Sequence, residues 1–189
     1  MERTDEELVT AHLAGDEEAF SRLVKHNLKS IYSFAARSAP NDAEDIVQDV
    51  FLKAWKNLKS FNPDTAKFKT WLMRIARNTV IDHLRKKTPH IFSELERAEG
   101  EDRFANEPDT SPLPDEVVAR AHDARALEAA LAELAPPSRE VLLLRYMNQL
   151  SFEEIAEVLN KPANTVRSRH RRALTHLRTH LEALHQKTL

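Results

Sequence analysis

The side chains whose types and spacing could do chemistry lie near the C-terminal end of the chain, after a break in a helical pattern. Asn160-Lys161-Pro162 makes the break, and proline suits the first position of a new helix because it has no amide hydrogen to lose. At 100° per residue, one side of this helix carries Asn164, Ser168, Arg171 and Thr175. Arginine pairs bidentately with guanine in the major groove, and Ser and Thr can bind bases or phosphates. The pattern therefore predicts contact with DNA.

A short helix must position this segment from its N-terminal side. Ser151 and Glu154 have the spacing of a capping box, in which two free amide hydrogens at a helix start are satisfied reciprocally. Apolar residues follow at helical spacing, namely Phe152, Ile155, Val158 and Leu159. Two helices joined by a tight turn, the second with a polar and basic outer face, are typical of a helix-turn-helix. The alternative is an ordinary helical hairpin with a solvated basic face.

A second group of candidate residues lies between positions 59 and 87. Asn62-Pro63-Asp64 indicates a turn, so we expect a loop over 60–67 and then a helix from about Phe68 or Thr70 to Arg85. Three aromatic residues are interleaved with three lysines in and beside this loop: Phe61, Phe68, Trp71, Lys59, Lys67 and Lys69. Single-stranded nucleic acid is bound by this combination of cations and flat side chains. The alternative is that the aromatic residues belong to the core, and we favour it for Trp71.

Composition limits the fold class and the functional classes. The 189 residues include two glycines and no cysteine, so we expect an all-α chain without disulfides, which fits a reducing cytoplasm. No apolar run is long enough to predict membrane insertion. The net charge of −2 hides an alternation, because residues 59–87 carry eight basic and two acidic side chains while residues 88–135 carry four and twelve. Residues 136–189 are basic again, with nine basic and five acidic side chains. Two basic blocks separated by an acidic one suggest two contacts with a polyanion.

A helix expected within residues 41–58 presents a candidate protein-docking face. Its predicted buried stripe consists of Ile46, Val47, Val50, Phe51, Ala54, Trp55 and Leu58. The opposite side carries Asp45, Gln48, Asp49 and Leu52. An exposed leucine beside carboxylates hints at a bound protein, although single exposed leucines are common. Capping boxes are expected at Asn41 with Glu44 and, for the first helix, at Thr4 with Glu7.

Three ordered motifs together carry a family resemblance. The stretches DAEDIVQDVFLKAW, FKTWLMRIARNTVIDHLR and LSFEEIAEVLNKPANTVRSRHRRA resemble the characteristic segments of extracytoplasmic-function (ECF) sigma factors, a class of bacterial transcription initiation factors that are not enzymes. The resemblance implies two small helical domains, sigma region 2 over residues 1–87 and sigma region 4 with its helix-turn-helix over residues 115–189. The acidic and proline-rich composition of residues 88–114 predicts a flexible linker between the two domains.

The resemblance also implies partners and roles for individual residues. Core RNA polymerase is the expected partner, contacted at its β′ clamp helices and its β flap. The β′ clamp helices would bind the first domain at Asp45, Gln48, Asp49 and Leu52. The minus-ten promoter strand would contact Ser60, Phe61, Asp64, Lys67, Phe68, Arg74, Arg77 and Asn78. The minus-thirty-five element would contact Asn164, Thr165, Arg167, Ser168, Arg171 and Arg172. An anti-sigma protein is the expected regulator, and no cofactor is implied.

Other interpretations have less support from the sequence. A stand-alone helix-turn-helix regulator is the main alternative, but it leaves the aromatic and basic segment at 59–87 unexplained. His176 and His180 have a spacing that can hold a metal ion but lack an evident third ligand, and the carboxylates near Asp45 diverge around their helix, so we expect no metal site. His170 stands where the family usually has an apolar residue, and we expect it to be buried and neutral.

Overall fold

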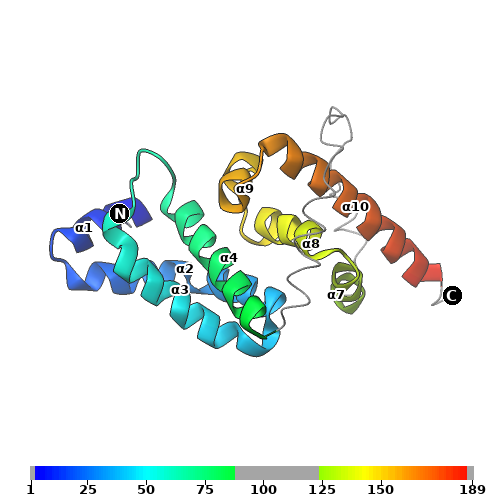
Figure 1. Ribbon diagram of the computed structural model, residues 1–189, viewed down its shortest axis with the longest axis horizontal. Coiled ribbons are helices and arrows are strands. Elements are labelled where there is room, and N and C mark those ends of the chain that lie inside the picture. The colour runs from blue at the N-terminus through cyan, green and yellow to red at the C-terminus, as the bar shows by residue number, and fades with distance from the viewer. Residues whose placement is uncertain (1–2, 88–123, 187–189) are drawn as a thin grey trace.

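The computed structural model describes residues 3–87 and 124–186, and within them the chain forms helices and turns but no strand. The predicted linker and residues 115–123 of the predicted region 4 domain lie outside the described residues. Two helical bundles lie side by side along the long axis of the molecule (Figure 1). We call residues 3–87 the N-terminal bundle and residues 124–186 the C-terminal bundle.

The N-terminal bundle is built from four α-helices with short 3₁₀ turns between them. In order these are α1 (Asp5–Leu13), α2 (Glu17–Ser38), η1 (Pro40–Asp42), α3 (Ala43–Asn57), η2 (Leu58–Ser60) and α4 (Phe68–Lys87). The Thr4–Glu7 capping box is present, as predicted. The one expected at Asn41 and Glu44 is wrong, because Pro40 opens a 3₁₀ turn and Asp42 becomes the N-cap without a side-chain bond. The carboxylate of Glu6, on α1, accepts a hydrogen bond from the Phe68 amide at the start of α4, with a distance of 2.9 Å.

The C-terminal bundle contains α7 (Ala124–Ala132), α8 (Pro136–Leu142), a π-helical turn η3 (Leu143–Met147), α9 (Phe152–Leu159) and α10 (Ala163–Gln186). α8 continues directly into η3, where the helical stretch adopts the wider π turn. Arg139 ties α8 to the end of α7 by donating hydrogen bonds to the carbonyls of Leu131 and Leu134 at 2.8 and 3.2 Å. Burial of its guanidinium lowers the pKa of Arg139.

The helix-turn-helix has the predicted local construction. Ser151 and Glu154 form the capping box at the start of α9, and Asn160 ends this helix in the left-handed conformation that asparagine tolerates better than most residues. Pro162 lies just before α10 instead of in its first turn. The inner side of α10 follows the predicted spacing, since Val166, Ala173 and Leu177 are all buried.

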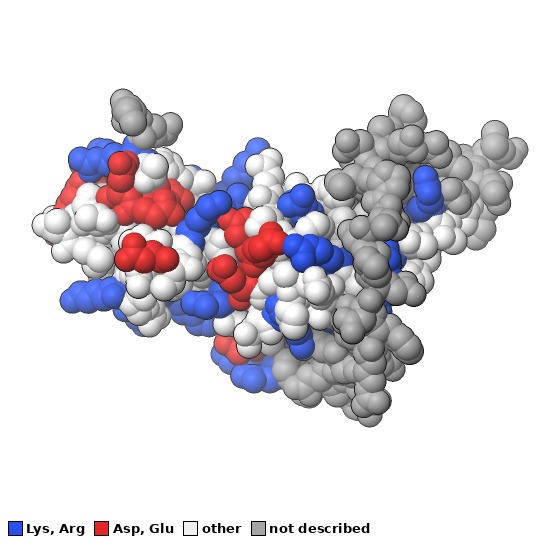
Figure 2. Space-filling model, turned by 90° about the horizontal axis from the view of Figure 1, so that it is seen from above, with Lys and Arg blue, Asp and Glu red and all other residues white. Residues whose placement is uncertain are grey.

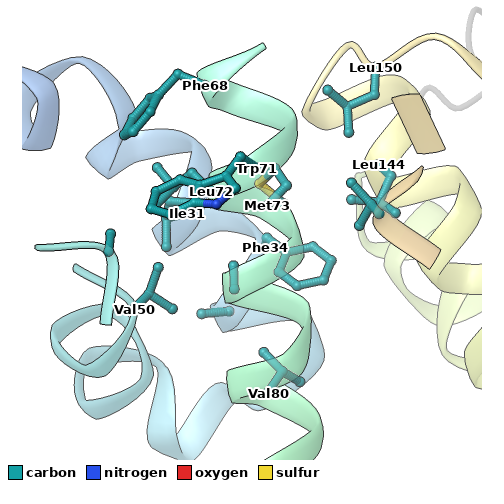
Figure 3. Packing of buried hydrophobic residues seen from close by; sticks show 14 of the residues in the cluster. Ile31, Phe34, Val50, Phe68, Trp71, Leu72, Met73, Val80, Leu144 and Leu150 are labelled. Carbon is teal, nitrogen blue, oxygen red and sulfur yellow. The ribbon is translucent and has the colours of Figure 1, made fainter. Parts of the chain in front are cut away.

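A single apolar cluster extends across both bundles. Met73 of α4 points towards Leu144 and Leu150 of the C-terminal bundle, and these three side chains are 0, 0 and 2% exposed (Figure 3). A smaller cluster, around Ala130, Leu142 and Leu181, holds α7 and α8 against α10. The bundles are therefore packed together in this structure.

Candidate nucleic-acid and protein interfaces

The outer face of α3 is polar at one end and apolar at the other. Gln48 is exposed, and Asp49 accepts a hydrogen bond from Nε2 of His83 on α4 at 3.0 Å. Leu52 is 48% exposed, as predicted, and Trp55 is 54% exposed, although we expected it in the buried stripe. Spacing along α3 groups Trp55 with buried residues but does not say how far the neighbouring helices extend. The exposed indole enlarges the apolar part of this face, and the sequence did not reveal it.

The loop before α4 is organised by its own side chains. The Asn62 side-chain oxygen accepts a hydrogen bond from the Asp64 amide at 3.0 Å, a turn that asparagine forms readily. Ser60, Asp64 and Lys67 are exposed, as binding to a DNA strand requires. This loop presents polar groups to solvent while its flanking aromatic residues point inward.

Phe61, Phe68 and Trp71 form a compact aromatic cluster under the loop. Their ring centroids are 5.5 to 5.6 Å apart, and the Phe61 and Phe68 rings meet edge to face. Phe68 is 1% exposed and the other two are 7% exposed. The core interpretation that we favoured for Trp71 is confirmed, and in this structure it extends to Phe61 and Phe68. A stacking role for those two rings stays a prediction that would require the loop to rearrange.

Three polar residues of α4 line a cleft between the bundles. Arg74, Arg77 and Asn78 lie on one wall, and residues 157–161 at the end of α9 lie on the other. The cleft encloses about 560 Å³. Arg74 and Asn78 are exposed, whereas the Arg77 side chain is 13% exposed because it meets Glu140 of α8.

The predicted recognition face of α10 is partly accessible. Asn164 and Arg172 are exposed, and Thr165, Arg167 and Arg171 are half-buried. Arg167 is held by Glu153 of α9 and by the Asn164 side chain. Ser168 differs from the expectation of an exposed group, since it is 8% exposed and its hydroxyl points to the carbonyl of Thr165. Binding to DNA remains a prediction for all six residues.

His170 is buried, as expected, at 5% exposure. Its Nε2 lies 3.2 Å from the hydroxyl of Tyr146, and its ring meets the edge of Phe152 at 5.0 Å. These contacts connect η3, α9 and α10, so the imidazole fills the place of an apolar side chain while its nitrogen has a partner. The sequence did not reveal Tyr146 as this partner, because 24 residues separate the two positions.

A carboxylate at the start of α9 also reaches the N-terminal bundle. Glu154 accepts a hydrogen bond from the Ser151 amide at 2.7 Å and forms an ion pair with the Lys67 ammonium at 2.9 Å. Burial by itself raises the pKa of Glu154, but the Ser151 amide and the Lys67 charge outweigh it and hold the pKa below its usual 4.5. The hydrogen bond and charge of Glu154 in turn raise the pKa of Lys67.

This lowered pKa predicts a pH dependence that Glu154→Gln should remove. A depressed carboxylate pKa contributes stability above the unfolded-state value, and that stability is lost as the pH falls through the folded-state value. Glutamine can still accept the Ser151 amide, so the variant removes the charge and keeps the cap. We expect wild type to be more stable than Glu154→Gln at about pH 7 and this difference to shrink below about pH 4.5, as measured by thermal unfolding. A difference that stays constant with pH would contradict the prediction.

Comparison with known proteins places these features in a family. Residues 23–89 match the model for Sigma-70 region 2, and residues 124–177 match that for Sigma-70, region 4. The chain is 36% identical over 174 residues to the ECF RNA polymerase sigma factor SigW of Bacillus subtilis, covering 90% of this chain and 92% of the relative. The chain belongs to the ECF sigma factors. The ECF sigma-E factor of Escherichia coli K12 is 35% identical over 177 residues, with 88% of each chain covered.

Two solved structures share the fold of this chain. CnrH in complex with the cytosolic domain of CnrY is 29% identical, with a TM-score of 0.67 over 96% of this chain and 99% of that one. RpoE of Bartonella quintana, in complex with the anti-sigma factor NepR, is 26% identical, with a TM-score of 0.65 over 87 and 98%. The all-α fold of this ECF sigma factor is thus confirmed, and the family assignment favours the initiation factor over a stand-alone regulator. No helix in the described residues of this sigma factor is long and apolar enough to cross a membrane.

Proposed function

We propose that this sigma factor binds core RNA polymerase through α3, reads the minus-thirty-five element with α10 and captures the minus-ten strand with the loop at 60–67 and α4. The observation that carries the proposal is the presence, in one chain, of an exposed face on α3 that includes Leu52 and Trp55 and a capped helix-turn-helix whose second helix has a polar and basic outer face. A repressor or activator needs only the second of these. The sigma region 2 domain would extend over residues 1–87, residues 88–114 would be the linker, and region 4 would occupy residues 115–189.

The docking face would bind the β′ clamp helices through Asp45, Gln48, Asp49 and Leu52, and we add Trp55 to this set because its indole is exposed beside Leu52. Aromatic residues are enriched at protein interfaces. Region 4 would meet the β flap. An anti-sigma protein would regulate the chain in the cytoplasm, which is supported by the solved relative whose title names NepR as an anti-sigma factor.

Transcription from a promoter library tests the proposed function. The purified chain is added to core RNA polymerase and a library of randomised promoters, and the transcripts are sequenced. We expect initiation from a subset of promoters that share two short elements. Binding to duplex DNA without any promoter-dependent initiation would favour a stand-alone regulator and overturn the proposal.

Gln48→Ala is expected to weaken association with core polymerase about fivefold, or about 1 kcal/mol, because an exposed side chain at an interface contributes modestly. Gln48 is a cleaner test than Asp49, because replacing Asp49 would also remove the contact with His83. Affinity is measured by fluorescence anisotropy of the labelled chain. Lys25→Ala, at an exposed position of α2, is the control. Wild-type affinity in Gln48→Ala, with unchanged helix content, would reject the docking assignment for this residue.

A further inference from the structure

The C-terminal bundle lies against the surface of α4 that the proposed function assigns to the minus-ten strand. α9 packs on α4, and η3 packs on α2. The apolar part of the contact joins Met73 to Leu144 and Leu150 (Figure 3). The cleft lined by Arg74, Arg77 and Asn78 is closed on its other side by the end of α9. The C-terminal bundle and the minus-ten strand would therefore contact the same surface of α4.

Two carboxylates of the C-terminal bundle meet two cations of that surface. Glu140 Oε1 accepts a hydrogen bond from Nε of Arg77 at 2.9 Å, and Glu154 Oε1 lies 2.9 Å from Nζ of Lys67. Carboxylate and phosphate oxygens both accept charge-assisted hydrogen bonds from guanidinium and ammonium groups, with similar geometry. Where the bundles meet, Figure 2 shows a cluster of acidic side chains bordered by basic ones. Glu140 and Glu154 therefore occupy cations that a DNA phosphate would need.

The contact between the bundles also contains a polar group that it does not satisfy. Asn148, which follows the end of η3, is fully buried, and its side-chain amide donates a hydrogen bond to Oγ of Ser30 at 2.7 Å. Its side-chain oxygen is buried without a hydrogen-bond partner. Leaving a buried acceptor unsatisfied has a free-energy cost, which separation of the bundles would relieve by exposing the amide to water. An interface of this kind suits a contact that opens more than a permanent core does.

We propose that the C-terminal bundle is an intramolecular competitor of the minus-ten strand, with Glu140 and Glu154 standing in for phosphates at Arg77 and Lys67. This inference rests on the proposed function, because it assigns Arg77 and Lys67 to that strand. In the closed chain the carboxylates occupy the cations that the strand would bind. The apparent affinity for the strand therefore equals the affinity of the open form multiplied by the fraction of molecules that are open. Separation of the bundles exposes the cations. The lowered pKa of Glu154 keeps its carboxylate ionised at neutral pH.

Affinity for single-stranded DNA tests the competition. The probe is a fluorescein-labelled oligonucleotide with the non-template minus-ten sequence of a promoter selected in the transcription experiment, and binding to the full chain is measured by anisotropy. Glu140→Gln with Glu154→Gln should raise the affinity about tenfold. Glu128→Gln with Glu133→Gln is the control, because it removes the same two charges from exposed positions in and directly after α7 of the C-terminal bundle. Equal affinity in wild type and the first variant, or an equal rise in the control, would overturn the proposal.

A distance measurement on otherwise unaltered protein keeps the proposal falsifiable if the variant does not fold. The chain has no cysteine, so Ser21→Cys on α2 and Thr179→Cys on α10, both exposed, can carry a donor and acceptor dye. We expect energy transfer to fall when saturating oligonucleotide is added, because the strand displaces the C-terminal bundle. Unchanged energy transfer at saturation would overturn the proposal. Either failure would leave promoter-dependent initiation intact, which separates it from a failure of the proposed function.

Discussion

Phe68→Ala is expected to lower the free energy of unfolding by about 3 to 5 kcal/mol, because removing a fully buried phenyl ring loses its burial and leaves a cavity. Phe68 is 1% exposed and packs edge to face on Phe61 and against Trp71. It begins α4, which positions Arg74 and Asn78, so the loss should reach the predicted DNA-binding surface. Urea denaturation of the full chain, followed by circular dichroism, measures the change.

Trp55→Ala is the matched control for this measurement. Trp55 is also aromatic and also belongs to the N-terminal bundle, but it is 54% exposed, so we expect its replacement to change stability by no more than about 0.5 kcal/mol. If Phe68→Ala were as stable as Trp55→Ala, the buried aromatic cluster would not be part of the core in solution. The stacking role for Phe68 would then become the better explanation of this residue.

Arg171→Ala is expected to weaken binding to the minus-thirty-five element by about 1 to 3 kcal/mol and to relax the base preference at one position. The reason is that Arg171 lies centrally on the predicted recognition face of α10, where a guanidinium can bond to a base edge. The measurement is a titration of the full chain against a randomised duplex library, followed by sequencing of the bound fraction. A uniform loss across sequences, with no change in base preference, would mean that α10 does not present Arg171 to the groove.

Arg178→Ala is the comparison for Arg171→Ala. Arg178 is exposed two turns further along α10, where we expect a phosphate contact at most. Its loss should weaken binding evenly across sequences and reduce the salt dependence by about one unit of slope. The two variants remove the same charge, so a difference in base preference between them separates base reading from charge attraction.

The sequence by itself determined the features that depend on residues close together in the chain. The capping boxes of Thr4 with Glu7 and Ser151 with Glu154 need only a spacing of three residues, and both are present. The helix-turn-helix and the all-α class follow from local periodicity and from the scarcity of glycine. The resemblance to ECF sigma factors was carried by three ordered motifs, and the family matches confirm it. The predicted capping box at Asn41 failed because a neighbouring proline set a different local turn.

The tertiary structure decided which side chains are covered and which distant groups meet. Periodicity predicts that residues share a face of a helix, but not where a neighbouring helix stops covering it, so Trp55 was placed in the core and is exposed. For the same reason the inward orientation of Phe61 and Phe68 was open until the loop and α4 were folded together. The ion pairs of Arg77 with Glu140 and of Lys67 with Glu154 join groups far apart in the chain. No local pattern encodes such a pair, because it exists only when the apolar contact between α4, η3 and α9 brings the two bundles together.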